Sequence, residues 1–202
     1  MTTSIDRVVG SHDWNQVTTP PQAIREATGA LVAAQGPGAL TVEQLASLVE
    51  GLTQRADLWR PLVVTDARRR RYRLIYDDDR IDVWVLSWMP GQHTGFHDHG
   101  DAGVALAAVD GHVVERQMRV TGGAHEQVLQ PGRVQVGAPG YIHSVAHGAG
   151  EPAVTIHAYS PPLVEVGQYR ATEDGLLVRE RQHGRQELLD HTIATLLDGP
   201  PA

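Results

Sequence analysis

Apolar side chains recur every three or four positions in two stretches near the start of the chain, residues 20–35 and 40–54. This spacing predicts two amphipathic helices, because residues so spaced share one face of a helix. Thr41 and Gln44 stand at the start of the second stretch in the pattern of a capping box. We therefore expect residues 1–66 to form an N-terminal helical region.

After this region the spacing changes to the alternation of apolar and polar residues that is typical of strands. Residues 71–76 and 81–88 flank an acidic turn, which predicts a hairpin. Asp110 and Gly111 stand between two further apolar stretches and predict another hairpin turn. We expect a β-barrel over residues 67–182.

The last residues, 183–202, return to helical spacing and stop at Gly-Pro-Pro, which predicts a C-terminal helix that packs on the barrel or on another subunit. No repeat, linker or low-complexity tract divides the chain. We expect residues 1–202 to form a single, mainly β domain with N-terminal helices and a C-terminal helix.

Composition narrows the possible chemistry. The 202 residues include no cysteine and no lysine, and the formal net charge is −7. Without cysteine there are no disulfides, thiolate metal ligands or cysteine nucleophiles, so histidine and carboxylate remain as the strong metal ligands. Lysine Schiff bases are excluded, and the acidic balance argues against a nucleic-acid partner. No signal-peptide pattern or apolar span of membrane length occurs, so we expect a cytoplasmic protein with no membrane partner.

Three histidines form the strongest chemical pattern. His97 and His99 are two apart, so on a strand both can point to one place inside a barrel. A Pro-Gly turn and His143 follow later, and Gly91 precedes the pair. Together these resemble the two-part motif of the cupin fold, a double-stranded β-helix or jelly-roll barrel. We expect all three histidines to ligate a metal.

Most cupins add a glutamate soon after the histidine pair. Here the only nearby acid is Asp101, which could be a ligand but suits a turn or cap better, and Asp110 belongs to the predicted hairpin turn. Three neutral histidines leave a divalent ion its full charge and open positions, which suit an anionic substrate group such as a thiolate beside O₂.

A polar row follows the third histidine. Thr155, His157 and Tyr159 alternate with aliphatic residues and so share one strand face. A buried polar row needs hydrogen-bond partners. The row is either a structural ladder or, beside a metal, a relay that orients the tyrosine hydroxyl toward a substrate.

These motifs resemble the cysteine dioxygenase family of thiol dioxygenases. The stretches HDHG, PGYIHSVAH and EPAVTIHAYSPPL carry the resemblance, which runs from about Arg71 to Leu163. Members are cupins whose three-histidine iron(II) converts a thiol into a sulfinate with both atoms of O₂. The resemblance therefore implies an Fe(II) cofactor with His97, His99 and His143 as its ligands. It implies that Tyr159 is catalytic, with His157 as its hydrogen-bonding partner and Thr155 in place of a family serine. Trp88 matches a tryptophan of the family and is a candidate substrate-binding residue.

Several positions depart from the family pattern. Animal members crosslink a cysteine to the tyrosine, whereas this chain has Gly103 or Val104 in that region, so Tyr159 would act without a crosslink. His147 stands where the family has asparagine; it would either tune the substrate fit or be a solvated loop residue. The peptide bond before Pro161 matches one that is cis in the family.

The family also binds its substrate carboxylate with an arginine in a Tyr-x-Arg strand. Here the sequence RRRRYRLIY offers Arg71 or Arg73, depending on the alignment, and both lie on one strand face with Arg70 and Tyr72 on the other. A run of arginines is also typical of a solvated edge. We expect one of Arg71 and Arg73 to reach the pocket.

We thus expect a non-haem iron(II) thiol dioxygenase that converts a small thiol, cysteine or 3-mercaptopropionate, and O₂ into the sulfinic acid, as a monomer or homodimer. A bulkier thiol such as ergothioneine is an alternative, because the arginine register and His147 depart from the cysteine pattern. A metal-binding cupin without oxygenase activity, a sensor or isomerase, is the alternative of another class. The polar row of Thr155, His157 and Tyr159 argues against it.

Overall fold

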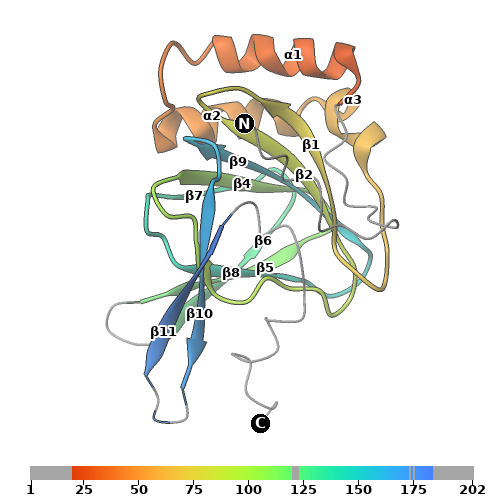
Figure 1. Cartoon of the computed structure of the whole chain (residues 1–202). Coiled ribbons are helices and arrows are strands. Elements are labelled where there is room, and N and C mark those ends of the chain that lie inside the picture. The colour runs from red at the N-terminus through yellow and green to blue at the C-terminus, as the bar shows by residue number, and fades with distance from the viewer. Residues whose placement is uncertain (1–19, 120–122, 173, 175, 184–202) are drawn as a thin grey trace, which may run out of the picture.

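The computed structural model describes residues 20–119, 123–172, 174 and 176–183. Within these residues the chain is mainly β, with two antiparallel sheets that face each other and helices that cover one of them (Figure 1). This confirms the expected cupin architecture with N-terminal helices.

Within the described residues, the helices all precede the strands. In chain order they are α1 (Gln22–Ala33), α2 (Val42–Thr53), α3 (Ala56–Trp59) and the 3-10 helix η1 (Arg60–Leu62). The capping box predicted at the start of α2 is confirmed, because the Thr41 side chain accepts from the Gln44 amide and the Gln44 side chain accepts from the Thr41 amide. No helix in the described part of the chain is long and apolar enough to cross a membrane.

The strands form two sheets of different size. The five-stranded sheet has the order β1 (Arg71–Asp77), β2 (Asp82–Trp88), β9 (Ala153–Ser160), β4 (Gly103–Asp110) and β7 (Val134–Gly137). The six-stranded sheet has the order β11 (Leu177–His183), β10 (Glu165–Ala171), β3 (His97–Asp98), β8 (His143–His147), β5 (Val113–Met118) and β6 (Ala124–Leu129).

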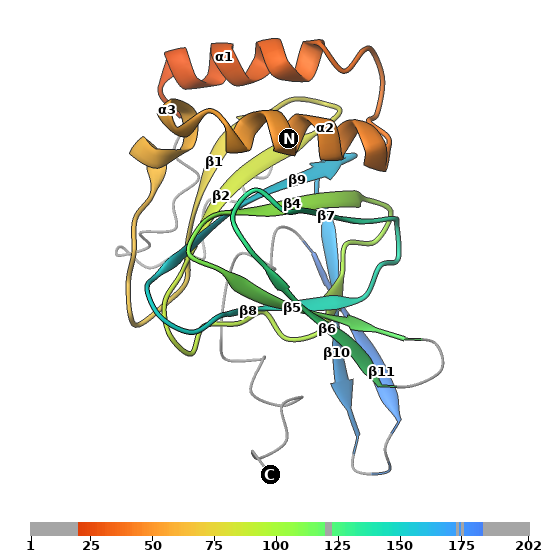
Figure 2. The same ribbon diagram turned by 180° about the vertical axis from the view of Figure 1, so that it is seen from behind.

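The five-stranded sheet separates two apolar clusters. Its outer face carries aliphatic side chains such as Val85 and Ile156, which pack with the buried faces of α1 and α2. Figure 2 shows these two helices lying over this sheet. Its inner face carries larger side chains, including Trp84, Trp88 and Tyr159, which fill the space between the sheets. Strand alternation alone produces this division, since neighbouring residues point to opposite faces.

The hairpin predicted over residues 71–88 is present, because β1 pairs with β2. The hairpin predicted at Asp110 and Gly111 is wrong: the turn is there, but it joins β4 to β5, which belong to different sheets and pair with other strands. Gly111 has a φ of +58°, and a Cβ there would lie 2.7 Å from the Pro152 carbonyl oxygen, so this turn requires glycine. The Ser160-Pro161 bond is cis. His183 ends β11, and the C-terminal helix predicted beyond it lies outside the described residues. The division into residues 1–66, 67–182 and 183–202 stays a prediction.

Candidate metal centre

Three buried imidazoles meet at the inner face of the six-stranded sheet. His97 lies in β3, His99 directly follows that two-residue strand, and His143 begins β8. β3 and β8 pair so that His97 lies opposite His143. One ring nitrogen from each histidine lies within 4.8 Å of the others, and all three side chains are at most 3% exposed. Among the described residues, this group is the one whose geometry could hold a metal ion.

The hydrogen bonds at the Nδ1 atoms orient two of these rings. Nδ1 of His97 lies 3.0 Å from the Gly95 carbonyl oxygen, and Nδ1 of His143 lies 2.8 Å from Oε1 of Glu115. A carbonyl and a carboxylate only accept hydrogen bonds, so each Nδ1 carries the proton. The lone pair of each ring is therefore on Nε2, the atom that a metal would use.

His143 is neutral at physiological pH. Its pKa is lowered to about 4: burial has the largest effect, the neighbouring His97 and His99 also lower the pKa, and the hydrogen bond to Glu115 raises it but offsets them only in part. A neutral imidazole is the form that ligates a metal. Nε2 of His143 is buried and has no hydrogen-bond partner among the described residues, so it is open to an ion. The residues present thus fit a first-row divalent metal that accepts nitrogen ligands.

A hydrogen-bonded row faces the histidines from the five-stranded sheet. Trp88 Nε1 donates to Oγ1 of Thr155 at 2.8 Å, and that oxygen lies 3.0 Å from Nε2 of His157. Nδ1 of His157 lies 3.0 Å from the Tyr159 hydroxyl. All four side chains are completely buried. The predicted polar row is thus connected from end to end, and Trp88 belongs to it.

The tyrosine end of this row reaches the three histidines. The rings of Tyr159 and His99 have centroids 5.0 Å apart, so the row and the three histidines share one space between the sheets. Val104 lies opposite Tyr159 in the pairing of β4 with β9 and is fully buried, whereas a Cβ at Gly103 would point toward Val42 of α2. Val104 is therefore the residue beside the tyrosine.

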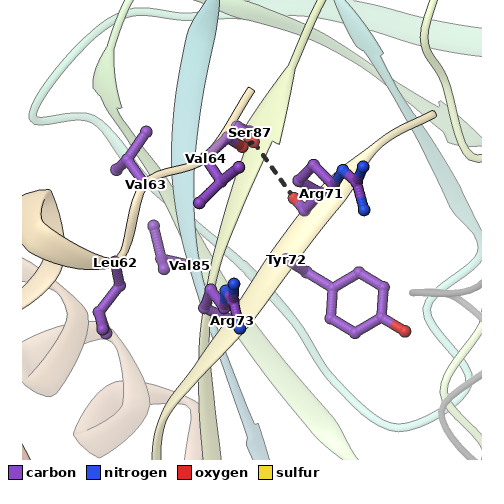
Figure 3. A pocket seen from close by; sticks show the side chains of 8 residues that line it. All are labelled: Leu62, Val63, Val64, Arg71, Tyr72, Arg73, Val85 and Ser87. Atoms are coloured by element: carbon purple, nitrogen blue, oxygen red, sulfur yellow. Dashed lines mark hydrogen bonds between the residues drawn. The ribbon is translucent and has the colours of Figure 1, made fainter. Parts of the chain in front are cut away.

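Arg71 and Arg73 lie on the opposite face of β1 from the histidines. They pair in register with Ser87 and Val85, whose side chains face the helical layer. Arg71 forms an ion pair with Asp66, and both arginines line a pocket on that side that is too narrow for a water molecule. Figure 3 shows Arg73 beside Val85, with the ring of Tyr72 extending away from them. The expectation that one of this pair reaches the metal pocket is therefore corrected.

Arg70 lies on the inner side instead. Its guanidinium carbon is 4.8 Å from the centroid of the Trp88 ring, and the residue is 4% exposed. Tyr72 shares this face and makes an edge contact with Trp84 at 5.8 Å between centroids. The pairing of β1 with β2 thus places Arg70 and Tyr72, and not Arg71 and Arg73, on the face toward the barrel interior.

Two other candidates lie away from the three histidines. Nε2 of His147 lies 2.9 Å from the Glu151 carbonyl oxygen, which can only accept, so this nitrogen donates. The His147 ring lines a separate cavity of about 160 Å³ beside Phe96 and Arg116. Asp101 is exposed in the turn after His99 and does not belong to the metal-binding group.

Two buried acids at the site were not identified from the sequence. The first, Glu115 of β5, contacts His143. Burial would raise the pKa of Glu115, but hydrogen bonds from His143, Gln127 and Tyr141 outweigh it and lower the pKa. The sequence does contain a signal for this acid. Glu115 stands two residues after Val113, so on a strand both side chains point to the inward face.

The second acid, Asp98, stands between His97 and His99 with its side chain on the other side of the strand. Arg179 of β11 donates to both of its oxygens, at 2.6 and 2.7 Å, and the Tyr169 hydroxyl donates at 2.7 Å. Burial would raise the pKa of Asp98, but these contacts lower it far below its usual range. A Cβ at Gly167 would lie 2.5 Å from Asp98, so glycine permits the close approach. The β10–β11 hairpin therefore clamps the segment that carries two of the histidines.

Comparison with known proteins gives a family match and distant structural likenesses. The family model for cysteine dioxygenase type I matches residues 31–172. Among solved structures, TT1209 from Thermus thermophilus is 21% identical with a TM-score of 0.46, over 51% of this chain and 93% of that protein. An uncharacterised conserved protein with a double-stranded β-helix domain from Klebsiella pneumoniae is 18% identical with a TM-score of 0.46, over 50% of this chain and 80% of that one.

Replacing Arg179 with methionine should destabilise the fold. The change leaves the Asp98 carboxylate, 5% exposed, without its two charge-assisted hydrogen bonds. We expect the free energy of unfolding to fall by about 1.5–3 kcal/mol, measured by urea denaturation. Arg181→Met is the matched control, because Arg181 is 61% exposed on the same strand and should change the value by about 0.5 kcal/mol or less. Equal losses in the two variants would contradict the clamp.

Proposed function

Since the chain belongs to the cysteine dioxygenase type I family, we propose that it is an iron(II)-dependent thiol dioxygenase that adds both atoms of O₂ to the sulfur of a small thiol, RSH, and forms the sulfinic acid, RSO₂H. The observation that carries the proposal is the meeting of three buried imidazoles with the Tyr159 hydroxyl at the end of a buried relay. A passive metal-binding protein has no evident need for that relay.

The three histidines are the proposed metal ligands. Iron(II) held by His97, His99 and His143 would supply the binding of thiolate and O₂ and the electrons that activate O₂. All three ligands are neutral, so the site favours an anionic sulfur over a neutral thiol. The surrounding barrel interior, formed by apolar side chains such as Val104 and Leu106, excludes bulk water from the reacting groups.

The relay would fix the direction of the Tyr159 hydroxyl. Trp88 can only donate, so its N–H occupies one lone pair of the Thr155 oxygen. We assign the Thr155 proton to Nε2 of His157, which places the remaining ring proton on Nδ1, facing the tyrosine oxygen. The tyrosine oxygen then accepts from His157, and its own proton is directed into the pocket, where it can hydrogen-bond to the reacting sulfur and oxygen atoms.

Arg70 is the proposed substrate-binding arginine. It is the arginine of the run that lies on the inner face, and the flat Trp88 ring supports its guanidinium. A guanidinium binds a carboxylate through two parallel hydrogen bonds, which matches a thiol substrate that carries a carboxylate. Cysteine and 3-mercaptopropionate are the proposed substrate class.

Oxygen uptake by the iron-loaded protein tests the function. We expect consumption of one O₂ per thiol with cysteine or 3-mercaptopropionate, and a product that has gained two oxygen atoms by mass spectrometry. Uptake only with ergothioneine would move the proposal to a bulkier thiol. If the protein binds iron stoichiometrically but takes up no O₂ with cysteine, 3-mercaptopropionate or ergothioneine, the dioxygenase proposal is overturned in favour of a metal-binding cupin without oxygenase activity.

Removal of the Tyr159 hydroxyl should slow turnover and leave the metal in place. A positioned hydrogen-bond donor or acid contributes roughly 10²- to 10⁴-fold in rate. We therefore expect the Tyr159→Phe substitution to lower kcat by a factor within or just below that range. Iron content, measured by a chelator assay, should match that of the parent. Tyr76→Phe is a suitable control, because Tyr76 packs with the helical layer on the outer face. An unchanged kcat in Tyr159→Phe would reduce the tyrosine to a structural role.

The arginine assignment predicts different effects for Arg70, which directly precedes β1, and for Arg73 inside that strand. Arg70→Met should raise KM for a carboxylate-bearing thiol roughly ten- to a hundredfold, because a charge-assisted hydrogen bond is lost. Arg70→Lys should restore little of the affinity, since an ammonium lacks the planar fork. Arg73→Met, on the outer face, should leave KM unchanged. If Arg73→Met raises KM and Arg70→Met leaves KM unchanged, the substrate carboxylate binds on the other face of β1.

A further inference from the structure

The carboxylate of Glu115 lies next to the three-histidine group and contacts one of its histidines, His143. Its Oε1 accepts from Nδ1 of His143 at 2.8 Å, and the side chains of both residues are fully buried. We propose that Glu115 is a positioning residue that sets the metal affinity and the reduction potential of the three-histidine centre through His143. The proposal rests on the metal centre described under the proposed function.

Other side chains hold Glu115 so that it must accept from His143. The Tyr141 hydroxyl donates to the same Oε1 at 3.0 Å, and Gln127 Nε2 donates to Oε2 at 2.7 Å. The orientation of the Gln127 amide is fixed independently, because its oxygen accepts from Arg133 at 3.4 Å. Every described neighbour of the carboxylate is therefore a donor, which matches an ionised acid.

These contacts close into a ring. Gln127 Nε2 also donates to the Gln135 oxygen at 2.8 Å, and Gln135 Nε2 donates to the Tyr141 hydroxyl at 3.2 Å, which in turn donates to Glu115. Gln135 lies in β7 of the other sheet, so the ring ties both sheets to the carboxylate. A Cβ at Gly137 would lie 2.4 Å from the Tyr141 ring, so this glycine permits the tyrosine to pack there. The carboxylate therefore has little freedom to leave His143.

The position of this charge has a chemical consequence. A carboxylate that accepts from Nδ1 makes Nε2 a stronger electron donor and holds the ring in one orientation. It also places one negative charge beside a centre whose ligands are all neutral. Glu115 thereby supplies, through His143, part of the charge that a glutamate ligand would supply directly, while leaving the coordination position open for substrate. Loss of the charge should disfavour the more oxidised, more positive metal.

Glu115→Gln tests the inference because it removes the charge and keeps the shape. We expect affinity for Co(II) and for Fe(II), measured by chelator competition without thiol or O₂, to fall about ten- to a hundredfold. The Fe(III)/Fe(II) potential of the iron-loaded variant should become more positive, which loss of packing alone would not produce. Tyr141→Phe is the matched control, since it removes one donor to Glu115 but keeps the carboxylate on His143; it should change both values much less.

Thermal unfolding of the metal-free proteins separates this role from a folding defect. A Glu115→Gln protein that unfolds like the parent yet binds metal with the parent's affinity and potential would overturn the inference. A comparable loss of affinity in Tyr141→Phe would also overturn it, because the charge would not be the cause. If the parent binds metal but oxidises no thiol, the proposed function fails and the inference about Glu115 still stands on the affinity and potential measurements.

Discussion

The pairing of β3 with β8, which sets His97 opposite His143, is the contact on which the proposed metal centre depends. β3 is only two residues long, so its own ladder hydrogen bonds hold it weakly. Side-chain contacts of buried acids add to this pairing. Arg179 and Tyr169 hold Asp98 of β3, and Glu115 holds the ring of His143 in the paired strand β8. A short strand can therefore carry a site that requires precise placement.

The two buried acids act on the centre in different ways. Asp98 faces away from the histidines and is neutralised by Arg179, so it anchors backbone and contributes little charge to the pocket. Glu115 faces the three histidines and is bound by neutral donors, so its negative charge remains beside His143. A buried carboxylate held in this way is stable because its hydrogen bonds replace the lost water. The neutral ligand set and this one charge together define the electrostatics of the site.

The five-stranded sheet divides structural from chemical roles by its two faces. The outer face packs under α1 and α2, while the inner face presents the row from Trp88 to Tyr159. On β1, a change of one residue in register would exchange Arg70 for Arg71 at the inner face. The pairing of Arg71 with Ser87 decides this point, and it assigns Arg71 and Arg73 to the helical side.

Local patterns in the sequence determined the elements and most of the chemistry. Helical spacing and the capping box at Thr41 placed α2, the acidic turn placed the β1–β2 hairpin, and alternation put Thr155, His157 and Tyr159 on one face, because each of these signals acts between residues near one another in the chain. Turn residues also marked Asp110 and Gly111, but that the strands on either side enter different sheets was decided by the tertiary structure. Only the tertiary structure decided which face of β1 looks inward, that Glu115 meets His143, and that β11 reaches back to Asp98. These contacts join residues far apart in the chain, and strand register and sheet order, which depend on the packing of the whole barrel, bring them together.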